Sequence, residues 1–181
     1  MSIYRLWSRY TSKLKGKTLS YISKVSGNNT PVSVPSWDQT FLEMAFLISK
    51  RSKDAQTQHG CVITDQENRV IGMGYNSFPK GMPDHLLPNT RPHKYKWMVH
   101  SERNALANCV VRPENGIAYV TGQPCQDCAM AMYQEGIRKF VLAKRHGSAL
   151  LNEDDAACFD ILTTVGKIDV KWVDFQESQQ L

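Results

Sequence analysis

Two short stretches constrain this 181-residue chain more than any other feature. The first contains His100 and, two positions later, Glu102. The second contains Cys125 and Cys128 as a Cys-x-x-Cys pair. One imidazole and two thiolates are ordinary zinc ligands, but a structural zinc site normally uses four protein ligands. Three ligands beside a carboxylate leave a position for water and supply a base to act on it. The pattern therefore predicts a catalytic metal site and an enzyme.

Each stretch is expected at the start of a helix, directly after a chain turn. Cys125 and Cys128 are three residues apart, and residues with this spacing share one face of a helical turn, so both thiols can reach one metal. The positive end of the helix dipole also lowers a thiol pKa and favours the thiolate that binds zinc. A lone Cys-x-x-Cys pair is a weak indication, whereas the composite pattern strongly favours a metal site.

Composition favours one globular domain, which we place at residues 36–181. A hydrophobic content of 41% suffices for one core, and apolar runs such as residues 44–48 are far below the roughly 20 residues that span a bilayer. We therefore expect no transmembrane segment. Five cysteines, an odd number, favour a reducing compartment over a disulfide framework. A cytoplasmic location follows as an expectation.

The formal charge of +5 belongs to an N-terminal arm, residues 1–35. Residues 1–37 contain no acid, and the rest of the chain is close to neutral, which argues against a nucleic-acid partner for the body. Residues 3–14 can form a short amphipathic helix, and a linker is expected at about 24–35. The arm could pack on its own body or a neighbouring subunit, direct the chain to an organelle, or contact an anionic surface.

Helices and strands are expected to alternate after an opening hairpin. Ser36 and Gln39 form a capping-box pattern before a helix at about 37–51. A long proline-containing insert after Asn76 is typical of a binding loop. Strands are expected at 60–63, 70–75, 117–121, 139–143 and 170–173, and further helices at about 101–110, 126–135 and 155–164. This order predicts a three-layer α/β/α sandwich with a five-stranded mixed sheet.

The His-x-Glu and Pro-Cys-x-x-Cys stretches resemble the signature of zinc-dependent deaminases. From about Trp37 to Val173 the chain resembles the deoxycytidylate (dCMP) deaminases within that superfamily, with a cytidine deaminase-like fold. The matching stretches are residues 37–42, 51–54, 74–81, 94–95 and 102–105. The resemblance implies one Zn²⁺ per subunit on His100, Cys125 and Cys128. It also implies that Glu102 shuttles protons during hydrolysis of dCMP to dUMP and ammonia, which supplies dUMP for thymidylate synthesis.

The same resemblance suggests substrate and effector residues. Tyr75 and Asn76 stand where such enzymes seat the sugar, and Ser52 and Lys53 resemble the phosphate side of the pocket. Many of these enzymes are hexamers that dCTP activates and dTTP inhibits, and Gly81 and Asp84 resemble parts of that allosteric site. A triphosphate effector could carry Mg²⁺. Two departures from the family pattern are Ser101, where alanine is usual, and His59, which is either a structural histidine or a pocket contact.

Other readings of the pattern stay open. The substrate could be CMP, a 5-substituted dCMP, or cytosine or adenine within single-stranded nucleic acid. A protein of another class, a non-catalytic zinc-bearing module that binds nucleotides, would not need Glu102.

Overall fold

The computed structural model of the chain describes residues 32–144 and 153–175. A boundary between Val34 and Pro35 divides the chain into two parts, and the helices and strands of the described residues all lie in the second. The amphipathic helix predicted for residues 3–14 lies outside the described residues, so it stays a prediction. No helix in the described ranges is long and apolar enough to cross a membrane.

Five strands form one mixed sheet in the order β2-β1-β3-β4-β5. β1 (Gly60–Thr64) pairs antiparallel with β2 (Val70–Tyr75) and with β3 (Ile117–Val120). β3 pairs parallel with β4 (Lys139–Lys144), and β4 pairs parallel with β5 (Asp169–Asp174). The hairpin and the five-stranded mixed sheet predicted from the sequence are confirmed.

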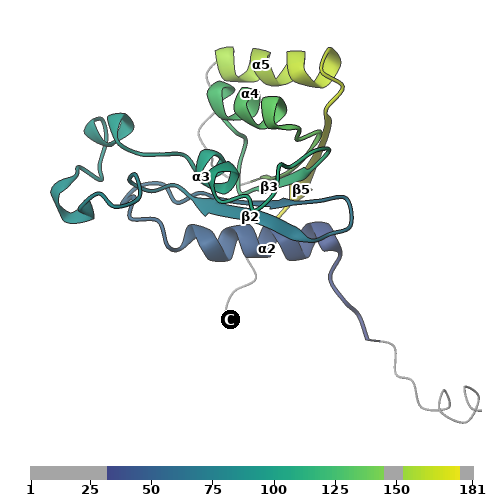
Figure 1. The fold of residues 1–181 in the computed structure, drawn as a ribbon, viewed down its shortest axis with the longest axis horizontal. Helices are drawn as coiled ribbons and strands as arrows, with labels where there is room; N and C mark the ends of the chain where they lie inside the picture. The colour runs from purple at the N-terminus through teal and green to yellow at the C-terminus, as the bar shows by residue number, and fades with distance from the viewer. Residues whose placement is uncertain (1–31, 145–152, 176–181) are drawn as a thin grey trace, which may run out of the picture. The chain divides into compact units, whose positions relative to one another are not determined.

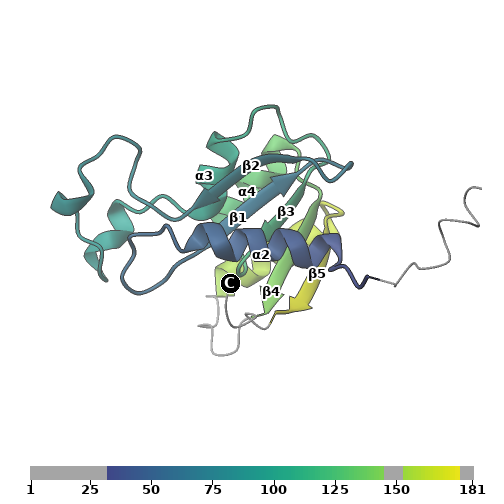
Figure 2. The same cartoon turned by 90° about the horizontal axis from the view of Figure 1, so that it is seen from below.

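Helices cover both faces of this sheet. α2 (Trp37–Ser49) lies on one face, and α3 (Ser101–Ala107), α4 (Gln126–Glu135) and α5 (Glu153–Thr164) lie on the other (Figure 1 and Figure 2). β1 is buried along its whole length for this reason. Its alternate side chains serve two cores: Val62 packs with the α2 cluster, whereas Cys61 and Ile63 pack with the cluster under α3, α4 and α5. The α/β/α sandwich is confirmed.

The first helix of the domain begins as its sequence predicts, with one change. The Ser36 hydroxyl accepts a hydrogen bond from the Gln39 amide at 3.2 Å. The Gln39 side chain does not complete the capping box, because it donates to Glu43 Oε1 at 3.2 Å instead. Ser36 therefore caps the helix alone.

α3 is shorter than the predicted helix at 101–110 and ends at Ala107. Beyond it the chain leaves the helix, and the amide of Val110 donates to the carbonyl oxygen of Ile71 in β2 at 3.0 Å. α3 also lies directly on β2, because a Cβ atom at Gly74 would meet the backbone of α3, including the Ser101 oxygen at 2.6 Å. Only glycine allows this approach, which fixes the height of α3 above the sheet.

The predicted insert after Asn76 extends from the sandwich and contains two short 3₁₀ turns, η2 (Asp84–Leu86) and η3 (His93–Lys96) (Figure 2). Its two ends are joined, because Ser77 and Val99 exchange backbone hydrogen bonds of 3.0 and 2.8 Å. The chain therefore returns to the sandwich immediately before His100.

Candidate active site

The predicted metal ligands meet at one edge of the sheet. His100 is the residue before α3 and Cys125 the residue before α4, and both have extended backbone angles. Cys128 follows in the first turn of α4 and is 1% exposed. The two helices follow β2 and β3, and ligands in open α/β sheets commonly bind beyond the carboxyl ends of strands. Two distant stretches are thereby brought to one point.

The geometry of the three side chains fits zinc. His100 Nδ1 lies 3.3 Å from Cys125 Sγ and 3.5 Å from Cys128 Sγ, and the three ligand atoms lie within 4.8 Å of one another. A tetrahedral zinc with ordinary bond lengths separates its nitrogen and sulfur ligands by about 3.5 Å. In the described ranges no other group of three such side chains gathers in this way. The donor set and its spacing support a Zn²⁺ site with three protein ligands.

A side chain from α5 contacts the start of α4. A helix begins with unpaired amide groups, and a residue at the position of Cys125 often caps one of them with its own side chain. Here Asp155 of α5 accepts from the Gln126 amide at 2.5 Å. α5 therefore satisfies the first of the unpaired amide groups of α4.

Contacts within the cluster change its proton affinities. Hydrogen bonding with Cys128 lowers the pKa of the Cys125 thiol, and the contact with His100 lowers it further. The same pairing raises the pKa of Cys128, and the contact with Cys125 raises the pKa of His100. One thiol thus ionises readily beside an imidazole, the state in which sulfur binds a metal.

Glu102 lies in the first turn of α3 and is 6% exposed. Burial raises the pKa of its carboxyl group, because the charged form loses solvation, although the nearby His100 and the Ser101 hydroxyl oppose this shift. The Ser101 hydroxyl donates to Glu102 Oε2 at 2.9 Å. A carboxyl with a raised pKa that is held in one orientation is suited to accept and return a proton.

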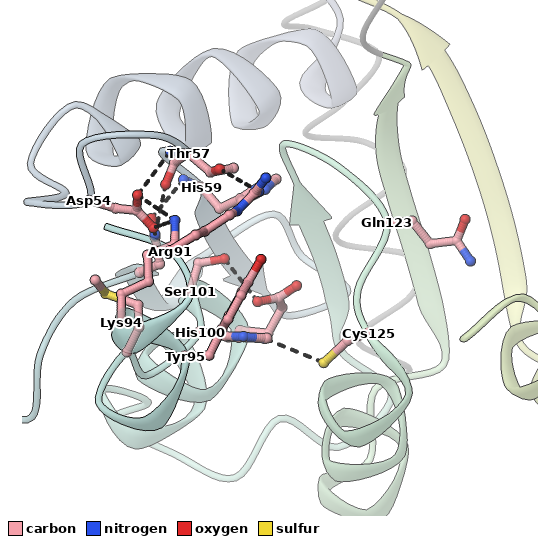
Figure 3. Close-up of a pocket in the computed structure, with 13 residues that line it drawn as sticks. Asp54, Thr57, His59, Arg91, Lys94, Tyr95, His100, Ser101, Gln123 and Cys125 are labelled. Atoms are coloured by element: carbon pink, nitrogen blue, oxygen red, sulfur yellow. Dashed lines mark hydrogen bonds and ion pairs between the residues drawn. The ribbon is translucent and has the colours of Figure 1, made fainter. Parts of the chain in front are cut away.

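One pocket joins these groups to residues from the insert and from the loop before β1 (Figure 3). Of the predicted residues, Asn76, His100, Glu102 and Cys125 line it, and so does His59. The residues that our sequence analysis did not single out as pocket residues are Asp54, Thr57, Arg91, Lys94, Tyr95, Met98, Ser101 and Gln123. The proline-containing insert, which we expected to be a binding loop, was the signal for Arg91, and Lys94 and Tyr95 also formed one of the stretches that resemble the family.

Asn76 is held rigidly at the pocket wall. Its Oδ1 accepts from the His59 amide at 2.7 Å, and its Nδ2 donates to the Thr57 carbonyl at 2.9 Å and to Asp54 Oδ2 at 3.2 Å. Both amide hydrogens therefore have partners within the protein. Its remaining capacity toward a sugar hydroxyl is as an acceptor, through the second lone pair of Oδ1.

Asp54 organises this wall from inside the protein. Lys94 Nζ lies 2.6 Å from both of its carboxylate oxygens, and each of the two side chains is 3% exposed. Asp54 Oδ1 also accepts from the amides of Gln56 and Thr57, at 2.8 and 3.0 Å. The pair joins the insert to the loop before β1, two segments that the sequence places 40 residues apart.

The predicted phosphate and effector residues lie elsewhere. Ser52 is buried and does not line this pocket, because its hydroxyl donates to the Asn76 carbonyl at 2.7 Å and accepts from the Asp54 amide at 3.2 Å. Lys53 and Asp84 form an exposed ion pair of 3.3 Å. Together with Tyr75 and Gly81, they line a second pocket that does not include the metal ligands. The structure thus separates Tyr75, Ser52 and Lys53 from the metal pocket.

Comparison with known proteins identifies the class of enzyme to which this pocket belongs. The profile of the cytidine and deoxycytidylate deaminase zinc-binding region matches residues 35–144. The chain belongs to the cytidine and deoxycytidylate deaminase family. The match begins one residue before the cap of α2 and ends with β4, so this deaminase domain has both metal-binding stretches and the insert within the region that defines the family.

Named relatives of this deaminase agree with the family. Deoxycytidylate deaminase of Mus musculus is 38% identical over 121 residues, which cover 62% of this chain and 68% of the mouse protein. The Homo sapiens protein of the same name is 37% identical with the same coverage. The crystal structure of dCMP deaminase from the cyanophage S-TIM5 has a TM-score of 0.59 and 20% identity, covering 78% of this chain and 100% of that one. The latter likeness confirms the cytidine deaminase-like fold.

Proposed function

We propose that this deaminase hydrolyses dCMP to dUMP and ammonia. The observation that carries the proposal is the meeting of His100, Cys125 and Cys128 with the buried Glu102 in one pocket. The family and the names of the mouse and human relatives support dCMP as the substrate. The cyanophage enzyme with the same fold has been crystallised with dCMP and dUMP, which gives further support.

Different residues of this chain have different roles in the proposed reaction. A zinc ion held by His100, Cys125 and Cys128 supplies the Lewis acidity that makes water nucleophilic near neutral pH. The Glu102 carboxylate accepts a proton from the attacking water and returns protons to the ring nitrogen and to the departing amine. A carbon–oxygen bond forms at the amine-bearing carbon, the carbon–nitrogen bond breaks, and ammonia leaves. The Ser101 hydroxyl keeps the Glu102 carboxylate oriented between these transfers.

An ammonia-release panel tests the substrate. We expect the highest kcat/KM with dCMP among dCMP, CMP, 5-methyl-dCMP, dCTP, deoxycytidine and a single-stranded oligonucleotide. A monophosphate preference excludes the nucleic-acid alternative, because an enzyme for bases in a polynucleotide should prefer the oligonucleotide. If the oligonucleotide is the best substrate, the proposed function is wrong.

A variant of Glu102 separates an enzyme from a non-catalytic zinc module. Glu102→Gln should retain one zinc per chain by elemental analysis and lose turnover by several orders of magnitude, because it removes the only proposed proton shuttle. Glu114→Gln is the matched control, since Glu114 is exposed and lies outside the pocket. Ammonia release from dCMP by Glu102→Gln at the wild-type rate would contradict the mechanism.

The second pocket is the proposed effector site. Lys53 can neutralise a phosphate, and Asp84 could instead help to hold a Mg²⁺ ion that arrives with a nucleoside triphosphate. We expect dCTP to activate and dTTP to inhibit, and Lys53→Gln to weaken both responses. We also propose a hexamer in the cytoplasm, which sedimentation of the purified protein and localisation of the full chain would test.

A further inference from the structure

The phosphate end of the substrate has no partner among the residues that our sequence analysis assigned to it. Ser52 is buried with its hydroxyl in two internal hydrogen bonds, and Lys53 lines the second pocket. A monophosphate carries nearly two negative charges at neutral pH and binds best to an arginine or lysine that no carboxylate has already neutralised. The phosphate partner is therefore expected to be such a cation in the lining of the metal pocket itself.

Two long cationic side chains line the metal pocket, those of Arg91 and Lys94. Lys94 is unsuitable, because both oxygens of the buried Asp54 lie 2.6 Å from its Nζ. Arg91 is exposed, and in the described part of the chain no carboxylate forms an ion pair with it. Arg91 is thus the un-neutralised cation of this pocket.

Arg91 is also held in place. Its backbone amide donates to Gln56 Oε1 at 2.7 Å, and its Nη2 donates to the Thr57 hydroxyl oxygen at 3.2 Å. A guanidinium group has five N–H donors, so most of them remain for a ligand after this single side-chain bond. Because Thr57 Oγ1 accepts from Arg91, its own hydroxyl hydrogen can be donated to an anion.

Arg91 lines the same pocket as two of the metal ligands, at a different part of its wall. Figure 3 shows Arg91, Thr57 and His59 gathered away from His100 and Cys125, toward the opposite end of the same pocket. Asn76 lies on the wall with an acceptor available for a sugar hydroxyl. Base, sugar and phosphate thereby each have a partner of suitable chemistry.

We propose that Arg91 binds the 5′-phosphate of the substrate, with the Thr57 hydroxyl as a second donor. The inference rests on the proposed function, because it takes the substrate to be a nucleoside monophosphate. Arg91 is then the residue that makes the enzyme select dCMP over deoxycytidine. Lys53 has no part in this selection.

Paired kinetics with dCMP and deoxycytidine test the proposal. Arg91→Gln should lower kcat/KM for dCMP by about 100-fold, the size expected for charge-assisted hydrogen bonds to a phosphate, and leave deoxycytidine turnover unchanged. Arg91→Lys keeps the positive charge but loses the paired N–H donors of the guanidinium group, so its kcat/KM for dCMP should lie between those of the wild type and Arg91→Gln. Lys96→Gln removes an exposed charge from the same insert without touching the pocket, and it should behave as the wild type.

Binding of the product gives a second measurement that does not depend on turnover. Calorimetry should show weaker binding of dUMP to Arg91→Gln than to the wild type, with equal binding of deoxyuridine. An unchanged dCMP-to-deoxycytidine ratio in Arg91→Gln would overturn the assignment, as would a loss of that ratio in Lys53→Gln instead. The wild type is measured before any variant. If it does not prefer dCMP over deoxycytidine, the proposed function itself is wrong.

Discussion

Replacing Lys94 with methionine should destabilise the protein far more than replacing any surface lysine. Lys94→Met keeps most of the apolar stem and removes the ammonium group, leaving Asp54 with a side chain that is 3% exposed and has no countercharge. Removing one partner of a buried ion pair typically costs about 3–5 kcal/mol. Asp54 keeps three N–H donors, from Gln56, Thr57 and Asn76, so the lower end of that range, about 3 kcal/mol, is expected.

Urea unfolding followed by tryptophan fluorescence measures this loss. For a chain of this size, about 3 kcal/mol corresponds to a fall in Tm of roughly 6–12 °C. Asp54→Asn in the Lys94→Met background should recover part of the stability, because no unpaired charge then remains.

An exposed lysine–aspartate pair in the same protein supplies the control. The side chains of Lys53 and Asp84 are 64% and 43% exposed, so Lys53→Met should cost about 1 kcal/mol or less. Equal losses of stability in Lys53→Met and Lys94→Met would refute the argument that burial makes the Asp54–Lys94 pair important.

Three further predictions follow from the same structure. Burial alone would raise the pKa of the Asp54 carboxyl group, but hydrogen bonds, first from Lys94, lower it below its usual value. The charged carboxylate therefore stabilises the fold fully above about pH 4, and this contribution is lost as the pH falls through the folded-state pKa. In urea titrations at low pH, the difference in unfolding free energy between the wild type and Lys94→Met should therefore narrow. Gly74→Ala should lower the free energy of unfolding by several kcal/mol and reduce bound zinc, because its methyl group would meet the backbone of α3. Gly81→Ala has open space around it and a φ of +87°, so it should lower the free energy of unfolding by only about 1–2 kcal/mol. Thermal melts with zinc analysis compare the two variants, and equal losses of stability would contradict the close approach of α3. Cys128→Ser should abolish stoichiometric zinc binding, and a chelator that lowers the Tm of the wild type should then leave the Tm of this variant unchanged.

The metal cluster could be predicted from the sequence because its geometry is local. Each half lies in one turn at the start of a helix, so the spacing of Cys125 and Cys128 alone places both sulfurs on one side. The β1–β2 hairpin could be predicted for a similar reason, since turn residues at 65–68 separate two short strand-like runs. Each of these parts depends on neighbours within a few residues, whereas the pairing of the two metal-binding halves, 25 positions apart, was indicated by the family signature.

The pocket wall could not be predicted, because it depends on pairings between distant loops. Asp54 contacts Lys94 across 40 positions, and Arg91 contacts Thr57 across 34. A loop residue has no periodic pattern that would reveal its partner. Ser52 shows how a residue type suited to phosphate binding can be misassigned. Its hydroxyl instead forms hydrogen bonds with the backbone of Asn76 and Asp54.

The pair of backbone hydrogen bonds between Ser77 and Val99 makes the insert a separable part of the enzyme. Because they close the insert at its base, its exposed residues can vary without moving His100, provided that the buried Lys94–Asp54 pair is kept. The insert carries Arg91 and Lys94 but no metal ligand. Exchanging it with that of another deaminase should therefore transfer preference for the substrate's phosphate end while leaving the deamination chemistry in place.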